Sequence, residues 1–249
     1  MEKMLIVAIL CLNILVIGCS QNLDNVQEPD LNTSTQERGP DKENEQEIKQ
    51  DRSLHPKTER QKNHLSTNWT SDRPILGESS APITLYKFTD FEEILSKRFY
   101  EMTQPKIVEE YVKTGRVKIV YKNFPLFSKR YETHKAADCV YKKGGSEAYY
   151  EYTRILYTNR DAIDEDSDTH SKKNLELWAK NIGHNISDCI AKVDDAEILQ
   201  DKSEGEEIDQ RSGVPMFYLV NSKGESRTIL GAKRIDVFRE KIESLKVKN

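Results

Sequence analysis

Cysteine is the residue type in this sequence whose side chain is best suited to redox or metal chemistry. The chain of 249 residues contains four cysteines, and they lie far apart at Cys11, Cys19, Cys139 and Cys189. No two of them have the close spacing with which paired thiolates hold zinc. The sequence therefore excludes a zinc finger or zinc ribbon.

Other motifs that would indicate a cofactor or a hydrolase are missing from the sequence. There is no G-x-S-x-G nucleophile elbow, no G-x-G-x-x-G loop and no Walker pattern. The acidic run 161–168 lacks the glycine and the terminal glutamate of an EF-hand, so we interpret it as a solvated loop. His134 is expected at the start of a helix or in contact with solvent. We predict no cofactor and no metal site.

The first nineteen residues have the pattern of a secretion signal. Lys3 precedes an apolar run over residues 4–17 that is too short to span a membrane comfortably. The run ends in Val16-Ile17-Gly18-Cys19, which resembles a bacterial lipobox, where the signal is cleaved before the cysteine and that cysteine is lipidated. We predict a signal peptide over 1–18 and a lipid anchor at Cys19. The alternative is an ordinary signal in which Cys19 is incidental.

The segment 19–72 differs sharply in composition from the rest of the chain. From residue 20 to residue 72, eleven acidic residues stand against seven basic ones, so the whole net charge of −4 falls here. Its strongly apolar side chains are few: Leu23, Val26, Leu31, Ile48, Leu54, Leu65 and Trp69. Because so little apolar surface cannot offset the entropy of ordering, we predict a disordered polar tether. No broad basic face occurs, which argues against nucleic acid as a partner.

Residues 73–249 have the pattern of a folded domain. The β-branched and aromatic run 83–88 predicts a strand, and apolar residues spaced three and four apart predict a helix over 92–113, kinked at Pro105. Residues 117–124 alternate as a second strand, which completes a β-α-β unit with parallel strands.

The remainder of the domain divides into a helical part and a closing unit. Residues 131–212 are interpreted as helical throughout, followed by short strands over 215–220 and 227–231 and a helix over 234–246. A β-α-β half, a helical insertion over about 128–212 and a β-β-α half together predict a thioredoxin-like α/β fold with an all-helical insertion.

Six short stretches, in their order and spacing, carry a resemblance to a known family. They are Ala81-Pro82-Ile83-Thr84, Phe88-Thr89-Asp90-Phe91, Lys97-Arg98-Phe99, Asn123-Phe124-Pro125-Leu126, Ala136-Ala137-Asp138-Cys139 and Gly213-Val214-Pro215-Met216-Phe217. Over about residues 73–246 the sequence resembles the DsbA-like thiol-disulfide oxidoreductases of the bacterial envelope. The resemblance implies a cis peptide bond before Pro215.

The resemblance breaks at the family's redox motif. In the family, Phe-x-Asp-Phe is followed by one residue and then by Cys-x-x-Cys at the start of a helix, whereas this chain has Glu93-Ile94-Leu95-Ser96 there. The helix dipole favours a carboxylate at Glu93, and Ser96 offers a hydroxyl, but neither group can exchange disulfides. No oxidoreductase of the usual mechanism can therefore operate from this motif. We interpret Glu93 as a solvated first-turn acid, or else as part of a recognition surface that contacts a cationic group.

The resemblance also assigns roles to two other places. Family members hold an extended substrate peptide on the loop before the third long strand, which makes Val214 and Pro215 candidate peptide-binding residues, although this loop also shapes the sheet edge. Some members carry a second, non-catalytic disulfide in the insertion, which here would join Cys139 to Cys189. The alternatives are two inert buried thiols, or a redox function at one of them.

Taken together, these patterns predict a lipid-anchored protein of the bacterial envelope that faces the extracytoplasmic side. We expect a redox-inactive binding or chaperone-like module for extracytoplasmic protein or peptide segments, held at the membrane through Cys19. One alternative is a divergent oxidoreductase that works through Cys139 or Cys189. Another is an envelope-assembly subunit, which an exposed apolar patch near Ile94 and Leu95 would favour.

Overall fold

The computed structural model describes residues 69, 72–162, 169–210 and 213–246. The predicted signal peptide (1–18), Cys19 and nearly all of the predicted tether therefore lie outside the described residues, as does most of the acidic run 161–168. In the part of the chain that is described, no helix has both the length and the apolarity needed to cross a membrane.

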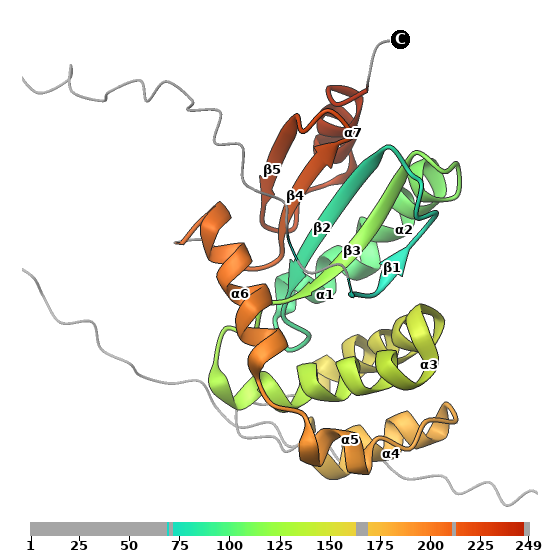
Figure 1. Ribbon diagram of the computed structural model, residues 1–249, viewed down its shortest axis with the longest axis vertical. Helices are drawn as coiled ribbons and strands as arrows, with labels where there is room; N and C mark the ends of the chain where they lie inside the picture. Colours follow the sequence, from blue (N-terminus) through green and yellow to red (C-terminus); the bar gives the residue numbers. More distant parts are fainter. Residues whose placement is uncertain (1–68, 70–71, 163–168, 211–212, 247–249) are drawn as a thin grey trace, which may run out of the picture. The chain divides into compact units, whose positions relative to one another are not determined.

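A five-stranded mixed sheet forms the centre of the domain, with the strand order β1-β3-β2-β4-β5 (Figure 1). Its strands are β1 (Ile75–Leu76), β2 (Ile83–Thr89), β3 (Val117–Asn123), β4 (Met216–Asn221) and β5 (Ser226–Leu230). β2 and β3 are parallel, and the other neighbouring pairs are antiparallel. The four longer strands agree with the sequence prediction. β1 was missed because two residues are too few to show an alternating pattern.

Helices that follow β2 and β5 cover one face of this sheet. The chain from β2 to β3 forms α1 (Ile94–Met102), α2 (Gln104–Ile107) and a π-helix, η1 (Val108–Val112), while α7 (Ile235–Glu243) closes the domain. Buried side chains of these helices, such as Phe99 and Phe238, pack with Leu85 of β2 in the main core. The predicted helix over 92–113 is interrupted at Thr103, and Pro105 lies in the first turn of α2, where a missing N–H is tolerated.

The insertion consists only of helices among its described residues. They are η2 (Ser128–Arg130), α3 (Tyr131–Thr158), η3 (Asn159–Ala162), α4 (Lys172–Asn181), α5 (Ser187–Lys192) and α6 (Ala196–Ile208). Helices α3, α4 and α5 lie beyond one end of the sheet, and α6 returns alongside it (Figure 1). The approach of α6 is close, because a Cβ atom added at Gly205 would lie 2.7 Å from the ring of Phe124.

The opposite face of the sheet is partly covered by Trp69, which corrects the predicted extent of the tether. The Trp69 side chain is only 8% exposed. Its ring centroid lies 4.8 Å from that of Tyr86, 5.7 Å from that of Phe88 and 5.2 Å from that of Tyr218. Composition averaged over a long polar segment cannot detect a single aromatic anchor, so the sequence argument placed this residue in the tether.

Candidate functional site

The residues that the resemblance singles out meet at one edge of the sheet. β2 ends at Thr89 and leads, through a short turn, into α1, which begins at Ile94. β4 begins at Met216, which pairs with Phe88 near the end of β2. The start of α1 and the loop that contains Val214 and Pro215 therefore lie at the same edge.

At this edge, Glu93 caps the helix with a partly exposed side chain, and Ser96 is buried. Glu93 is the N-cap of α1, and its carboxylate Oε2 accepts a 2.7 Å hydrogen bond from the backbone N–H of Ser96. Ser96 is fully buried, and its Oγ has no hydrogen-bond partner among the described residues. The two positions of the family's thiols thus hold a helix cap and a buried hydroxyl.

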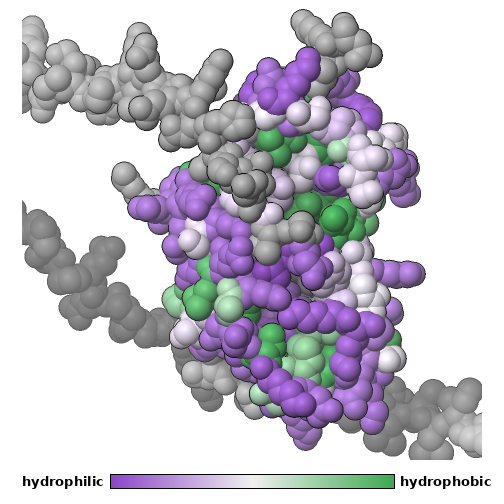
Figure 2. Space-filling view, in the orientation of Figure 1, coloured by the Kyte–Doolittle hydropathy of each residue, from purple (hydrophilic) through white to green (hydrophobic). Residues whose placement is uncertain are grey.

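Apolar side chains are exposed around the same turn. Ile94 is 49% exposed and Leu95 is 42% exposed. Phe127, in the loop that follows the parallel strand β3, is 55% exposed. We call Ile94, Leu95 and Phe127 the apolar edge. On the face that Figure 2 shows, the described part is mostly hydrophilic, with separate apolar patches.

The loop before β4 has the predicted backbone conformation. The Val214–Pro215 peptide bond is cis. The carbonyl oxygen of Pro215 accepts a 2.8 Å hydrogen bond from the N–H of Gly231, just after β5. Val214 is 3% exposed and packs with Met216 and Phe88 in the smaller of the two apolar clusters. The loop is thus fixed to the sheet by packing and by this hydrogen bond.

Asp90 fixes the turn between β2 and α1. Its Oδ1 accepts from the N–H of Glu92 at 2.9 Å, and its Oδ2 accepts from the N–H of Leu126 at 2.9 Å and from Arg130 Nη1 at 2.7 Å. Burial opposes ionisation of this carboxyl, but the hydrogen bonds and the nearby His134 and Arg130 lower the pKa of Asp90 to about 2. Asp90 therefore joins the two loops that form the edge.

His134 lies near the start of a helix, as the first of the two sequence alternatives has it, and is not in contact with solvent as the second has it. It lies in the first turn of α3 and is fully buried. Its Nδ1 is 2.8 Å from the side-chain oxygen of Asn123, and its ring lies against Phe91 with a centroid distance of 4.7 Å. The solvent expectation failed because it considered the helix alone, whereas the end of the sheet covers this side of α3.

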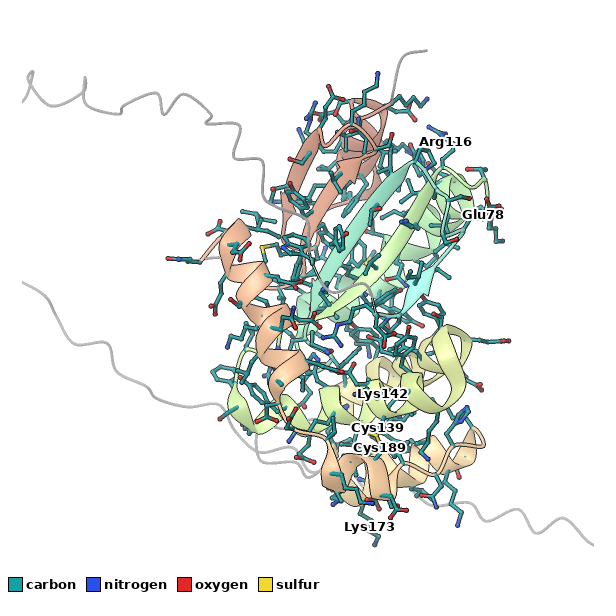
Figure 3. All side chains as sticks on the ribbon, in the orientation of Figure 1. Glu78, Arg116, Cys139, Lys142, Lys173 and Cys189 are labelled. Atoms are coloured by element: carbon teal, nitrogen blue, oxygen red, sulfur yellow. A yellow bond between two sulfur atoms is a disulfide. The ribbon has the colours of Figure 1, made fainter. Side chains whose placement is uncertain are left out.

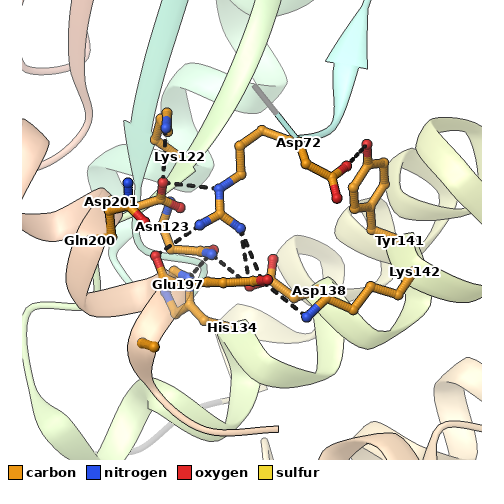
Figure 4. A network of polar contacts seen from close by, with 12 residues as sticks. Asp72, Lys122, Asn123, His134, Asp138, Tyr141, Lys142, Glu197, Gln200 and Asp201 are labelled. Carbon is orange, nitrogen blue, oxygen red and sulfur yellow. Dashed lines mark hydrogen bonds and ion pairs between the residues drawn. The ribbon is translucent and has the colours of Figure 1, made fainter. Parts of the chain in front are cut away.

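A buried network of charged groups joins the insertion to the sheet (Figure 4). Asp201 of α6 is fully buried, and its Oδ1 is 3.0 Å from both Arg73 Nε and Lys122 Nζ. Asp138 of α3 accepts a 2.9 Å hydrogen bond from the Asn123 amide. Burial raises the pKa of Asp138 to about 6, although Arg73 and Asn123 stabilise its charged form. Sequence alone does not predict this network, because charged residues normally lie at the surface.

A buried lysine lies between the sheet and α1. Lys87 of β2 is fully buried, and its Nζ donates a 3.0 Å hydrogen bond to Gln104 Oε1. The rings of Phe99, Tyr100, Tyr121 and Tyr157 surround the Nζ, with centroids 4.9–5.7 Å away. Burial lowers the pKa of Lys87 to about 7. The strand alternation could have found this residue, because Ile83, Leu85 and Lys87 point to the same face.

The remaining two cysteines are joined inside the insertion. Cys139 of α3 and Cys189 of α5 form a disulfide that closes a loop of 50 residues (Figure 3). Cys139 is fully buried, and Cys189 is partly buried. The bond links two helices and involves no residue of the apolar edge.

We expect loss of this disulfide to destabilise the domain. The disulfide closes this loop also in the unfolded chain and so restricts its conformations. Replacing both cysteines by serine should therefore lower the free energy of unfolding by about 2–4 kcal/mol. Urea denaturation of the oxidised chain, the reduced chain and the double variant measures the effect. The reductant should not change the double variant. A loss below about 0.5 kcal/mol would show that the bond does not restrict the unfolded chain as this argument requires.

The fold and the edge define a class of protein, namely thioredoxin-like domains with a helical insertion. A family model described as Thioredoxin matches residues 70–234. The match covers more than half of the chain, and the chain therefore belongs to this thioredoxin family.

Solved structures with the same architecture include DsbA proteins and BdbD. The alpha-DsbA1 of Wolbachia pipientis is 20% identical, with a TM-score of 0.58 over 71% of this chain and 92% of that one. The DsbA of Chlamydia trachomatis is 19% identical, with a TM-score of 0.59 over 73% and 93%. BdbD of Bacillus subtilis is 20% identical, with a TM-score of 0.53 over 69% and 91%. At these identities the likeness shows the fold, and the predicted fold class is confirmed.

Curated relatives agree with the predicted resemblance over part of the chain. The probable disulfide bond formation protein D of Bacillus cereus is 26% identical over 108 residues, which are 43% of this chain and 45% of that protein. The protein of the same name from Bacillus anthracis is 26% identical over 96 residues, or 38% and 44%. The chain matches less than half the length of these relatives. With the family model and the solved structures, they confirm the DsbA-like assignment.

Proposed function

We propose that this protein is a redox-inactive, lipid-anchored module of the bacterial envelope that binds extracytoplasmic protein or peptide segments. The observation that carries the proposal is the apolar edge, which also fits the alternative of an envelope-assembly subunit whose partner covers Ile94 and Leu95. Ile94 and Leu95 are both more than two-fifths exposed, at the helix start where the family carries its thiols. Exposed large apolar residues that lie together are typical of interaction sites.

The chemistry of the edge supports binding without redox turnover. Disulfide exchange requires a thiolate, and the edge holds Glu93 as a helix cap and Ser96 as a buried hydroxyl. A client segment would instead find apolar side chains beside the fixed Val214–Pro215 loop. The binding free energy would then come mainly from apolar burial at Ile94, Leu95 and Phe127.

The proposed location rests on sequence features outside the described residues, together with the disulfide. Cys19 follows a short apolar run, as a lipidated cysteine does. Disulfides such as Cys139–Cys189 persist in oxidising compartments, which include the bacterial envelope. The curated relatives are named for disulfide bond formation, and that activity is carried over here only as the rival hypothesis.

A substitution at the apolar edge tests the proposal. The purified full chain, in mild detergent, should bind a reduced, unfolded client protein in a titration by fluorescence anisotropy. Leu95→Glu places a charge in the contact, so we expect at least tenfold weaker binding, a difference of about 1.4 kcal/mol or more. Leu177→Glu is the matched control, because Leu177 is 50% exposed on α4. Equal binding by all three proteins would contradict the proposal.

The same samples test the rival hypothesis of a divergent oxidoreductase. Cys189 is only partly buried, so an external thiol could reach the disulfide from that side. Client thiols are counted before and after incubation with the oxidised protein. We expect no change in their number. Loss of client thiols that disappears in Cys139→Ser or Cys189→Ser would establish redox activity in the insertion.

A further inference from the structure

On the sheet face opposite α1 and α7, side chains of β2 and β4 form a binding position, which we call the seat, and Trp69 already occupies it. We call Tyr86, Phe88, Met216 and Tyr218 the aromatic face; they pack with Trp69 in one cluster. The Trp69 ring meets Tyr86 and Phe88 edge-on, at interplanar angles of 80° and 87°. Edge-to-face geometry of this kind favours an aromatic ligand over an aliphatic one.

The seat of Trp69 opens into a groove along the sheet. A hollow of about 530 Å³ continues along the same face, between Tyr86 and Val220 on the sheet and the turn at residues 221–224. Lys118 and Lys223 lie on its rim. An extended segment that places an aromatic ring in the seat therefore has further room along the sheet, next to two positive charges that suit an acidic neighbour.

Trp69 occupies its seat imperfectly. Its indole Nε1 is buried and has no hydrogen-bond partner among the described residues. A buried donor without a partner weakens the contact. Trp69 nevertheless has an advantage over a separate peptide. It belongs to the same chain as the seat, so it acts there at an effective concentration in the millimolar range.

We propose that the aromatic face is a second peptide-docking groove, specific for an extended acidic segment that carries a tryptophan, and that Trp69 is its resident occupant, displaced when a partner binds. The groove lies on the face opposite α1, so the proposal does not depend on binding at the apolar edge. Its ligand is recognised by an indole ring in the seat and by a carboxylate near Lys118 or Lys223.

Removal of the resident tryptophan tests the groove directly. The probe is a fluorescein-labelled peptide with the sequence of residues 63–72, which contains the tryptophan. Asp72 itself contacts Tyr141, so a second peptide with Ser66→Asp, on the other side of the tryptophan, tests the acidic preference and should bind more tightly. Anisotropy titrations use the full chain, Trp69→Ala and the matched control Trp178→Phe, which changes the other tryptophan. We expect Trp69→Ala to bind the peptide at least tenfold more tightly than the other two, and a peptide with alanine in place of tryptophan not to bind.

A second measurement covers the case in which Trp69→Ala fails to fold, as judged by circular dichroism. In the Trp178→Phe chain, Trp69 is the only tryptophan, so its emission reports whether the seat is filled. An excess of the peptide with 4-fluorotryptophan, an indole whose own emission is very weak, in place of tryptophan should shift this emission to the red and raise its quenching by acrylamide. Unchanged emission, or equal peptide affinity for folded Trp69→Ala and the full chain, would overturn the proposal.

Discussion

Asp201→Asn should lower the free energy of unfolding by about 1.5–3 kcal/mol, because it removes the carboxylate that two buried positive charges share. Lys122 keeps Glu204 at 2.6 Å and Arg73 keeps Glu197 at 3.3 Å, so neither charge is left uncompensated. Asp201 Oδ1 lies 3.0 Å from Arg73 Nε and 3.0 Å from Lys122 Nζ, and Lys122 and Asp201 are both fully buried. The Asp201 Oδ2 also accepts from the N–H of Asn123 at 3.0 Å. Since Asp201 lies in the insertion and its partners lie in or beside the sheet, the substitution should loosen the junction between them.

An exposed ion pair gives the matched control. Glu110 and Arg239 form a bidentate pair at the surface, and Glu110→Gln should cost far less than Asp201→Asn because solvent screens exposed charges. Urea denaturation followed by circular dichroism measures both variants. Hydrogen exchange should show the loss of protection in Asp201→Asn concentrated at β3 and α6. A loss below 1 kcal/mol would mean that Arg73 and Lys122 do not depend on this carboxylate.

The fold was predictable because its long elements carry strong periodic signals. β3 alternates apolar and polar residues, β2 and β4 are short runs rich in apolar, β-branched and aromatic residues, and the helices between them show apolar spacings of three and four. Short or isolated features gave no such signal. β1 consists of two residues, and Trp69 is a single anchor within a polar segment. Both are fixed by contacts with residues distant in the sequence, which a local pattern does not record.

The cis bond before Pro215 followed from the resemblance, but the start of α1 was predictable only in what it lacks. The absence of thiols at Glu93 and Ser96 follows from the sequence directly. The exposure of Ile94 and Leu95 does not, because apolar residues at a helix start are as readily buried as exposed. The buried charges of Lys87, Lys122 and Asp201 were missed for a related reason. Burying a charge is unfavourable unless a partner is present, and those partners come from other elements.

Lys87 makes the stability of this domain depend on pH in a direction that can be tested. Burial lowers its pKa to about 7 from the ordinary value of 10.5. Below pH 7 the amine is protonated in both the folded and the unfolded chain, so its contribution does not vary. Between pH 7 and 10.5 the unfolded chain holds a proton that the folded chain lacks. Stability should therefore rise with pH, by up to about 1.4 kcal/mol per pH unit.

The aromatic neighbours of Lys87 do not interfere with this measurement. Burial raises the pKa of Tyr100, Tyr121 and Tyr157 above the ordinary value of 10.0. Their phenols therefore stay neutral between pH 7 and 9. Groups such as Asp138 titrate at lower pH and are common to every variant, so they cancel when slopes are compared.

Lys87→Met isolates the effect, because methionine fills a similar volume without a charge. We expect the free energy of unfolding of the unaltered chain to rise by about 2 kcal/mol more than that of Lys87→Met between pH 7 and pH 9. Lys106→Met, at an exposed position on α2, should keep the slope of the unaltered chain. Urea denaturation at closely spaced pH values gives the three slopes. If Lys87→Met has the same slope as the unaltered chain, the amine keeps its proton in the folded state. Its charge must then be stabilised by the Gln104 oxygen and the surrounding rings.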